Sequence, residues 1–420
     1  MTERIRSKRS PGGADSAVLQ PYLDRYAEPE SGNLPGLKPC YENVLVAPCF
    51  DESQDFLEEL LNGLPAGLLI ILVVNAPDNA GAAAIERSAR LWRIVGGKPE
   101  RPFQVGRYRE GMDILAINRV SAERLIPHRQ GVGLARKIGA DAACMLIATG
   151  RIKSPWIYMT DADVRLPPDY FQHAPATAGC ALLPFHHRAP AALAAQICCY
   201  ETKLRYYVNR LRAANSPYAF HTIGSTIAIH AETYAKVRGV PKRNAGEDFH
   251  LLNKAAKVAP VHRLRRPEIS IRARLSQRVP FGTGPALADM GDTADYRSYA
   301  PQSFACLAEA IAHIERGAAL PELTAALLDE LGFQHFIERA RRQRRHPETL
   351  RKATHQWFDG LRTLRFIHLA RRHYPDQPLS ASLDELLGPV DHLQRLKELE
   401  LENETRALPR IYGRFKPASQ

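Results

Sequence analysis

Short, continuous hydrophobic stretches alternate with helical patterns along the first part of the chain. Apolar residues recur at helical spacing between these stretches, which predicts helices at 56–61, 82–92 and 132–146. The hydrophobic stretches themselves predict strands at 43–47, 68–74, 114–117 and 156–160. Continuous hydrophobic strands are typical of a parallel sheet that is buried on both faces. Strands that alternate with helices in this way indicate a doubly wound α/β fold.

The pattern changes toward the C-terminus. A short strand at 178–184, a long helix at 190–213, a glycine-containing strand at 221–230 and a helix at 247–256 continue the α/β texture. Beyond residue 299 only helical stretches follow, at 303–316, 321–344, 348–371 and 382–402. Residues 1–38 are rich in Gly, Pro, Ser and charge, which is typical of a flexible arm. We therefore expect an arm at 1–38, an α/β catalytic domain at 39–299 and a helical region at 300–420.

Composition and charge narrow the class of protein. Hydrophobic content of 45% and charged content of 24% are ordinary for a globular protein. The longest apolar run, 64–76, is too short to span a bilayer, and residues 1–13 lack the apolar core of a secretory signal. The seven cysteines show no C-x-x-C pair, which favours reduced structural thiols. We expect a cytoplasmic protein.

The net charge of +12 is compatible with nucleic acid, an anionic membrane or a phosphorylated substrate. The densest basic run, 339–345, is interpreted first as the solvated face of a helix, with peripheral contact to an anionic membrane as the other interpretation. No clustered basic and aromatic residues indicate a nucleic-acid module. Nucleic acid is therefore not expected as a partner.

Two carboxylates follow the predicted strand 156–160 directly, in the sequence Asp161-Ala162-Asp163. In open α/β sheets, ligands bind beyond the carboxyl ends of the strands. Hard cations prefer carboxylate oxygens together with substrate phosphates. Asp161 and Asp163 are therefore candidate ligands of Mg²⁺ or Mn²⁺, and Asp161 is also a candidate partner of a ribose hydroxyl. A solvated turn is the alternative interpretation.

A second acidic pair, Glu247-Asp248, opens the predicted helix at 247–256. Acidic residues in a first helical turn often serve only to complement the helix dipole. Because the pair follows the Asp161-Ala162-Asp163 segment and a glycine-containing strand, we favour a catalytic role. Asp248 is the candidate general base, which would take a proton from an acceptor hydroxyl.

Taken in order, these segments resemble the family 2 glycosyltransferases, which have the GT-A fold. The resemblance covers about residues 42–280. Its pieces are Val44-Leu45-Val46-Ala47-Pro48-Cys49-Phe50-Asp51-Glu52, Gly131-Val132-Gly133-Leu134-Ala135-Arg136-Lys137-Ile138-Gly139, Asp161-Ala162-Asp163, His221 to Ile229, Tyr234 to Pro241, and Glu247-Asp248. It implies a GT-A type mixed sheet flanked by helices, here followed by the helical C-terminal region. It also implies that Glu247 and Asp248 are catalytic, and that Pro48, Asp51, Glu52, Arg136 and Asp161 bind the donor.

The chain departs from that family at two places. The second strand ends Val74-Asn75-Ala76-Pro77-Asp78, where the family usually has Asp-Asp or Asp-Gly near the nucleobase, so Asn75 and Asp78 are the candidates for base recognition. The Gln-x-x-Arg-Trp of processive members is absent, and Arg278 lies in its place. An arginine there can serve a diphosphate with paired N–H donors or be an ordinary surface residue.

The sequence thus predicts a metal-dependent, inverting glycosyltransferase that uses a UDP- or GDP-linked sugar and an unidentified acceptor. A nucleotidyltransferase of related fold is one alternative, although Pro48 to Glu52 is not the Gly-rich, basic signature expected after its first strand. A non-catalytic nucleotide-sugar-binding protein is another, and a nucleic-acid-binding protein ranks below both.

Overall fold

The computed structural model describes residues 14–37, 40–53, 55–275, 282–343, 346–388 and 391–403. Contacts divide the chain into two compact units. The first contains Met1–His186 and Thr222–Arg272, and the second contains His187–His221 and Ala273–Gln420. The division differs from the predicted boundary at residue 299, because the long helix at 194–213 and the stretch from 273 onward belong to the second unit.

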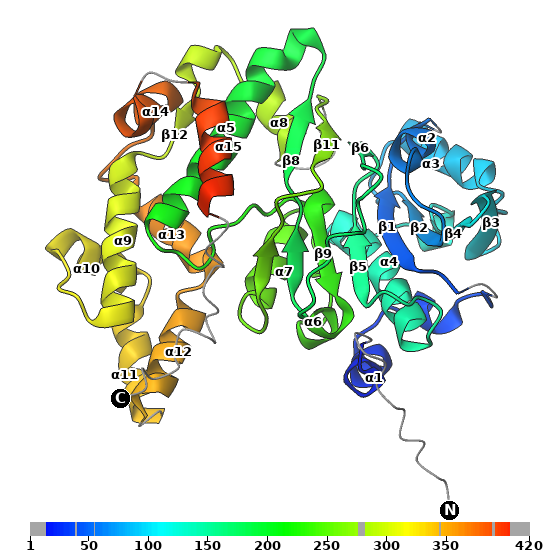
Figure 1. Cartoon of the computed structure of the whole chain (residues 1–420), viewed down its shortest axis with the longest axis horizontal. Helices are drawn as coiled ribbons and strands as arrows, with labels where there is room; N and C mark the ends of the chain where they lie inside the picture. The colour runs from blue at the N-terminus through cyan, green and yellow to red at the C-terminus, as the bar shows by residue number, and fades with distance from the viewer. Residues whose placement is uncertain are drawn as a thin grey trace, which may run out of the picture. The chain divides into compact units, whose positions relative to one another are not determined.

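The first unit is built on an eight-stranded sheet in the order β10-β7-β9-β5-β1-β2-β4-β3 (Figure 1). Its central strands β5, β1, β2 and β4 run parallel, whereas β3 and β9 are antiparallel to their neighbours. A second, three-stranded sheet has the order β6-β11-β8. The strands are β1 Asn43–Cys49, β2 Leu68–Asn75, β3 Phe103–Arg109, β4 Met112–Arg119, β5 Trp156–Met159, β6 Val164–Arg165, β7 Cys180–Leu182, β8 Phe185–Arg188, β9 Ile227–His230, β10 Val261–Arg263 and β11 Ile269–Arg272. The prediction of a mixed α/β sheet flanked by helices is confirmed.

Hydrophobicity on both faces explains the position of the central strands. Every residue of β2 is buried, and β1 is buried from its second residue onward. The helices of this unit are α1 Ser16–Arg25, α2 Phe56–Leu61, α3 Ala82–Ile94, α4 Gly131–Ala148, α6 Ala231–Lys236 and α7 Glu247–Ala255. Helix α4 packs on β1, β2 and β5. Gly139 lets it approach closely, because a Cβ there would lie 2.5 Å from Val46 Cγ1.

Residues 14–37 of the predicted flexible arm are ordered against this unit, so the prediction was wrong for them. Helix α1 buries Leu19, Tyr22 and Leu23 at helical spacing. The Tyr22 hydroxyl donates to Asp141 Oδ1 at 2.5 Å, and Lys137 Nζ donates to Asp141 Oδ2 at 2.7 Å. A buried carboxylate that is satisfied by donors from α1 and α4 fixes the two helices together. Residues 1–13 lie outside the described residues.

The second unit is mainly helical. Each of the three longest predicted helices is divided into two, and one division falls at Gly332, whose φ is 83°. A two-stranded pairing of β12 Arg297–Ser298 with β13 Gln377–Pro378 was not predicted. The helices are α5 Ala194–Ala213, α8 Thr283–Ala288, α9 Pro301–Arg316, α10 Glu322–Glu330, α11 Phe333–Gln343, α12 Pro347–Trp357, α13 Gly360–Ala370, α14 Leu379–Leu387 and α15 His392–Asn403.

Helix α5 belongs to this unit because its apolar residues complete the core of the helical region. Tyr206 and Leu211 of α5 pack in one hydrophobic cluster with Phe304 and Leu307 of α9. A domain boundary at residue 299 would separate these residues of α9 from the residues of α5 that they pack against.

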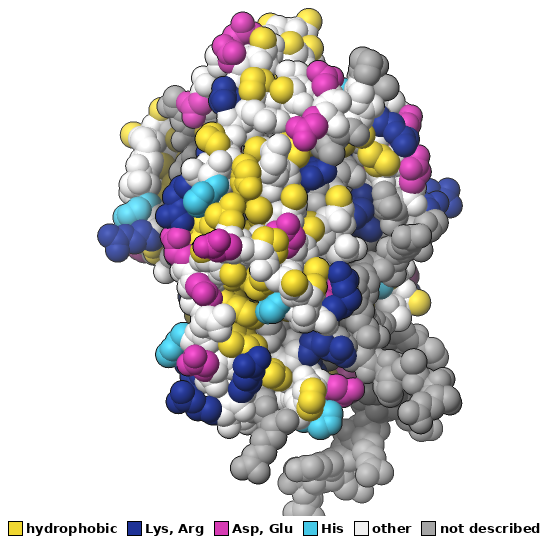
Figure 2. Space-filling model, turned by 90° about the vertical axis from the view of Figure 1, so that its left-hand side faces the viewer, with side chains coloured by type: hydrophobic (Ala, Val, Ile, Leu, Met, Phe, Trp, Pro, Cys, Tyr) yellow, Lys and Arg dark blue, Asp and Glu magenta, His cyan; other side chains and the backbone are white. Residues whose placement is uncertain are grey.

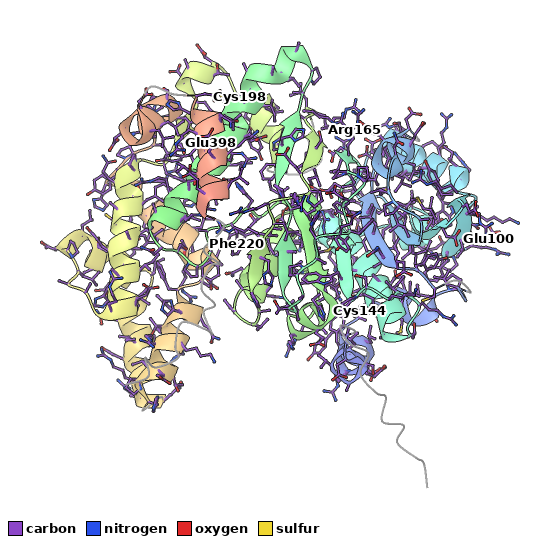
Figure 3. All side chains as sticks on the ribbon, in the orientation of Figure 1. Glu100, Cys144, Arg165, Cys198, Phe220 and Glu398 are labelled. Carbon is purple, nitrogen blue, oxygen red and sulfur yellow. The ribbon has the colours of Figure 1, made fainter. Side chains whose placement is uncertain are left out.

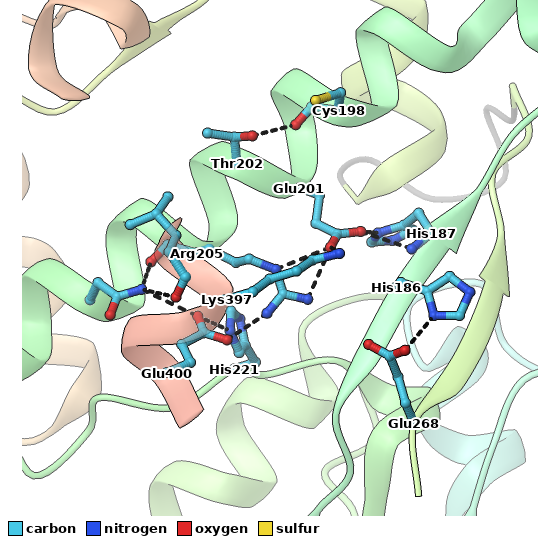
Figure 4. A network of polar contacts seen from close by, with 12 residues as sticks. His186, His187, Cys198, Glu201, Thr202, Arg205, His221, Glu268, Lys397 and Glu400 are labelled. Carbon is cyan, nitrogen blue, oxygen red and sulfur yellow. Dashed lines mark hydrogen bonds and ion pairs between the residues drawn. The ribbon is translucent and has the colours of Figure 1, made fainter. Parts of the chain in front are cut away.

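A buried ionic network joins α5 to α15 (Figure 4). Glu201 accepts from Arg205 Nε at 3.0 Å and lies 3.2 Å from Lys397 Nζ. Glu400 on α15 accepts from Arg205 Nη1 at 2.5 Å and contacts His221 Nε2 at 3.0 Å. Burial opposes the charge of both carboxylates. His187, Arg205 and Lys397 nevertheless hold the pKa of Glu201 below its usual value, and His221 and Arg205 do the same for Glu400. The network therefore attaches the C-terminal helix through charge as well as through Leu396.

On the face drawn in Figure 2, Lys and Arg side chains are interspersed with Asp and Glu. No helix among the described residues is long and apolar enough to cross a membrane. Cys144 is buried in α4, whereas Cys198 is exposed on α5 (Figure 3), and all seven cysteines are free thiols.

Candidate functional site

The Asp161-Ala162-Asp163 segment leaves the sheet at the carboxyl end of β5. The Thr160 amide still donates to the Val46 carbonyl at 3.0 Å, which continues the β1–β5 pairing by one residue. The chain then turns, and the Asp163 carbonyl accepts from the Arg272 amide at 2.8 Å in β11. Ala162 is buried within the turn, while the Asp161 side chain is 36% exposed. Asp161 and Asp163 therefore flank the buried Ala162 at this edge of the sheet.

Arg136 of α4 connects the two acidic segments. Its side chain is only 3% exposed. Nη2 donates to Asp161 Oδ1 at 2.7 Å, Nε donates to Glu247 Oε1 at 3.2 Å, and Nη1 donates to the Gly224 carbonyl at 3.3 Å. Burial works against its charge, but the carboxylates of Asp161 and Glu247 raise the pKa of Arg136 above its usual value. The Arg136 guanidinium thus fixes the carboxyl end of β5 relative to the residue that begins α7, Glu247.

Glycines make room for this arrangement. A Cβ on Gly224 would lie 2.6 Å from Arg136 Nη2, so only glycine lets the guanidinium approach that backbone. A Cβ on Gly133 would lie 2.5 Å from the Pro241 carbonyl oxygen. The Gly133 amide also donates to the Arg243 carbonyl at 3.0 Å, so the loop that leads to Glu247 rests directly on α4.

Helix α7 begins at the acidic pair. Gly246, with a φ of 70°, precedes the helix, and Glu247 is 4% exposed. Asp248 is partly buried, and its Oδ1 accepts from the Phe249 amide at 2.6 Å. Burial and the neighbouring Glu247 charge raise the pKa of Asp248 to about 7. A carboxylate with that pKa can accept a proton near neutral pH.

Glu247 differs from Asp248 in having a direct cationic partner. Burial raises the pKa of Glu247, and the Arg136 charge opposes that rise. The two neighbouring carboxyl groups therefore have distinct environments: one pairs with a buried guanidinium, and the other has the protonation behaviour expected of a base.

The turn after β1 has an unusual backbone. Asp51 adopts a φ of 57°, and its amide donates to Ser88 Oγ at 2.9 Å. Arg87 forms an ion pair with the Asp51 carboxylate. The charges of Glu52 and Asp161 both act on the buried Cys49 thiol and, together with its burial, raise its pKa. Because β1 and β5 are neighbouring parallel strands, the turn after β1 that holds Asp51 and Glu52 lies at the same sheet edge as Asp161.

Two predicted donor contacts are engaged within the sheet. Pro48 is buried in β1 opposite Val73. Asn75 is 5% exposed, and with its amide nitrogen turned toward the strands it donates to the carbonyls of Val73 at 3.0 Å and Cys49 at 3.3 Å. These contacts tie β1 to β2, so base recognition by Asn75 stays a prediction.

Two further residues, Asp78 and Arg278, were predicted to bind the nucleotide-sugar donor. Asp78 is exposed and accepts from the His128 amide at 2.9 Å. Arg278 lies outside the described residues.

The residues present suit a divalent cation only in an open arrangement. No group of three or more His, Cys, Asp and Glu side chains among the described residues could enclose a metal ion. Asp161 and Asp163 supply carboxylate oxygens from one turn, and Asp161 remains partly exposed. Mg²⁺ is commonly held in this way, by one or two carboxylates, substrate phosphates and waters.

Comparisons with known proteins give little more. No protein-family model matches the chain, and no curated protein does. One similar solved structure is the crystal structure of S. aureus TarS 1-349 in complex with UDP-GlcNAc. The two chains are 13% identical, the similarity covers 86% of this chain and 88% of that chain, and the TM-score is 0.34. At this TM-score the similarity carries no argument for either fold or function.

Sequence reasoning missed how the site is held together. Arg136 was predicted to bind the nucleotide-sugar donor. In the structure its N–H groups donate hydrogen bonds to Asp161, Glu247 and Gly224. Gly224 was seen only as part of a glycine-containing strand, yet it leads a 3-10 turn at Gly224–Thr226.

Proposed function

We propose that this chain is a metal-dependent, inverting glycosyltransferase with a GT-A type first unit. It moves a sugar from a UDP- or GDP-linked donor to an acceptor hydroxyl. The observation that carries the proposal is the Arg136 bridge, which gathers Asp161 and Glu247 at one sheet edge with Asp248 beside them. The order of motifs that resembles the family 2 glycosyltransferases supports it.

The turn after β5 would bind the nucleotide-sugar donor. Asp163 and Asp161 would hold Mg²⁺ or Mn²⁺, which supplies positive charge to the departing diphosphate. Arg136 fixes the Asp161 carboxylate from behind through the 2.7 Å hydrogen bond. Because Arg136 is buried, it orients that carboxylate without competing for the donor.

The start of α7 would activate the acceptor hydroxyl. Asp248 takes the proton of the acceptor hydroxyl as its oxygen attacks the anomeric carbon, and the nucleoside diphosphate leaves from the opposite face. Because the hydroxyl oxygen attacks from the face opposite to the leaving group, the configuration at the anomeric carbon is inverted. The Glu247–Arg136 pair holds the first turn of α7, so the Asp248 carboxylate is positioned before the acceptor arrives.

The test is incubation of the purified full chain with UDP- and GDP-sugars and Mn²⁺ in the absence of acceptor. The proposal predicts slow release of a nucleoside diphosphate and free sugar from one donor. Release of pyrophosphate from a sugar phosphate and a nucleoside triphosphate would instead indicate a nucleotidyltransferase. Donor binding with no turnover, even with an acceptor library, would indicate a non-catalytic sensor and refute the proposal.

A further inference from the structure

Asp141 of α4 is a buried carboxylate that accepts hydrogen bonds from other segments of the first unit. Its Oδ1 accepts from the Tyr22 hydroxyl of α1 at 2.5 Å and from the Tyr234 hydroxyl of α6 at 2.6 Å. Its Oδ2 accepts from Lys137 Nζ at 2.7 Å and from the Glu28 amide at 2.8 Å. These bonds hold α1 and the residues that follow it against α4 and α6, on which α1 packs (Figure 1). No step of the proposed mechanism uses these groups.

The loop between α6 and α7 leads directly to the proposed base. We call this loop, residues 237–246, the base loop, because Glu247 and Asp248 follow it at the start of α7. Its second half rests on α4, where the Gly133 amide donates to the Arg243 carbonyl at 3.0 Å. The place of the Asp248 carboxylate therefore depends on where the base loop lies.

The first half of the base loop is held by residues 22–28, which we call the N-terminal brace. The Arg238 guanidinium lies over the Tyr26 ring, 4.7 Å from its centroid. Lys242 Nζ forms an ion pair with Glu28 Oε1 at 3.3 Å. The brace therefore contacts the base loop through side chains near both ends of this half of the loop.

Gly239 adds a contact that depends on the absence of a side chain. Its φ is 70°, and a Cβ there would lie 2.4 Å from the Tyr22 hydroxyl oxygen and 3.2 Å from Lys137 Nζ. Glycine thus lets the base loop lie directly against the brace. Because the Tyr22 hydroxyl is bonded to Asp141, the buried carboxylate fixes this closest point.

We propose that the N-terminal brace positions the proposed base: through the base loop it sets where the Asp248 carboxylate lies relative to the acceptor hydroxyl. This inference rests on the proposed function and adds Tyr26 and Lys242 as positioning residues. A general base acts only within hydrogen-bond reach of the proton that it takes, so a small displacement of the base slows the reaction. The turn after β5 is held by Arg136 and by β11 instead. Loosening the brace should therefore leave donor binding unchanged.

Two exposed contacts allow the brace to be loosened without touching the buried carboxylate. Tyr26 is 41% exposed, and Tyr26→Leu removes the aromatic ring under Arg238, whereas Tyr26→Phe keeps it. Lys242→Glu places like charges side by side at Glu28, whereas Lys242→Arg keeps the ion pair. The control Lys153→Glu makes the same charge reversal in an exposed ion pair elsewhere in the first unit.

The first measurement is amide hydrogen exchange of the full chain without any ligand. Tyr26→Leu and Lys242→Glu should each speed exchange over residues 238–250 by about twofold to fivefold, as the loss of one exposed contact allows. Tyr26→Phe, Lys242→Arg and the Lys153→Glu control should match the wild type there. Faster exchange that stops before residue 247, or that appears equally in the control, would overturn the proposal.

The second measurement is steady-state hydrolysis of the UDP- or GDP-sugar that the wild type accepts, with Mn²⁺ and with water in place of the acceptor hydroxyl. Tyr26→Leu/Lys242→Glu should lower kcat about tenfold and leave KM for the nucleotide sugar unchanged. Tyr26→Phe/Lys242→Arg should keep the wild-type kcat. An unchanged kcat in the first variant, or a raised KM with kcat unchanged, would overturn the positioning role. Absence of turnover in the wild type would refute the proposed function itself, whereas wild-type turnover with unaffected variants would refute only this inference.

Discussion

The Arg136 bridge gives the most specific stability prediction. Arg136→Met keeps most of the side-chain length and removes the charge and all hydrogen bonds to Asp161, Glu247 and Gly224. The Glu247 side chain is 5% exposed and would be left as a buried carboxylate without its cation. Removing one partner of a buried ion pair typically costs about 3–5 kcal/mol. Asp161 is more exposed and can regain water, so we expect the lower end, about 3 kcal/mol.

The loss should depend on pH in a defined direction. Burial already raises the pKa of Glu247, and without Arg136 it should rise further. A carboxyl group whose pKa is higher in the folded than in the unfolded chain favours folding while it is protonated and loses that contribution as pH rises through its folded pKa. The destabilisation by Arg136→Met should therefore be smaller at pH 5 than at pH 8.

Urea unfolding followed by circular dichroism, at both pH values, measures this effect. The matched variant is Arg136→Met/Glu247→Gln, which removes the stranded charge and should recover part of the loss at pH 8 while flattening the pH dependence. A loss below about 1 kcal/mol at pH 8, or a loss that is equal at the two pH values, would refute the buried-bridge reasoning.

Two further substitutions test the base and the loop that carries it. Asp248→Asn should retain donor binding and lose about 10²–10⁴-fold in transfer rate, and the wild-type kcat/KM should fall as pH drops below about 7, where Asp248 becomes protonated; near-normal turnover in the variant would place the base elsewhere. Gly133→Ala should lower stability by about 1–3 kcal/mol and slow turnover, because its Cβ would meet the backbone of Pro241 and Arg243. Gly106→Ala, where a Cβ would meet nothing within 4 Å, is its control, and equal melting temperatures for the two variants would contradict the packing argument.

The fold could be predicted where hydrophobicity alone decides it. The buried strands β1, β2 and β5 and the helix α4 lie within a few residues of their predicted positions. Strand β3 could not be predicted from hydrophobicity, because it pairs through its backbone at the sheet edge and exposes most of its side chains. The assignment of α5 to the second unit depends on contacts with α9, which are distant in sequence.

The candidate site could likewise be predicted from the sequence only in part. Motif order brought Asp161 and Glu247 into one hypothesis, and the structure brings both to Arg136. The bridge itself could not be predicted, because it depends on Gly224 leaving space for a guanidinium between segments far apart in the chain. The burial of Asn75 between β1 and β2 could not be predicted from local pattern either, because it is a consequence of strand pairing.

We propose above that Asp161 and Asp163 bind a nucleotide-sugar donor together with a divalent cation. The most direct test is isothermal titration calorimetry of the full chain with UDP- and GDP-sugars, with Mn²⁺ and with EDTA, for the wild type and Asp163→Ala. We predict that the wild type binds one donor in a Mn²⁺-dependent manner and that Asp163→Ala loses this dependence while its circular dichroism spectrum is unchanged. Unaltered Mn²⁺-dependent affinity in the folded variant, or affinity that EDTA leaves intact in the wild type, would contradict the account.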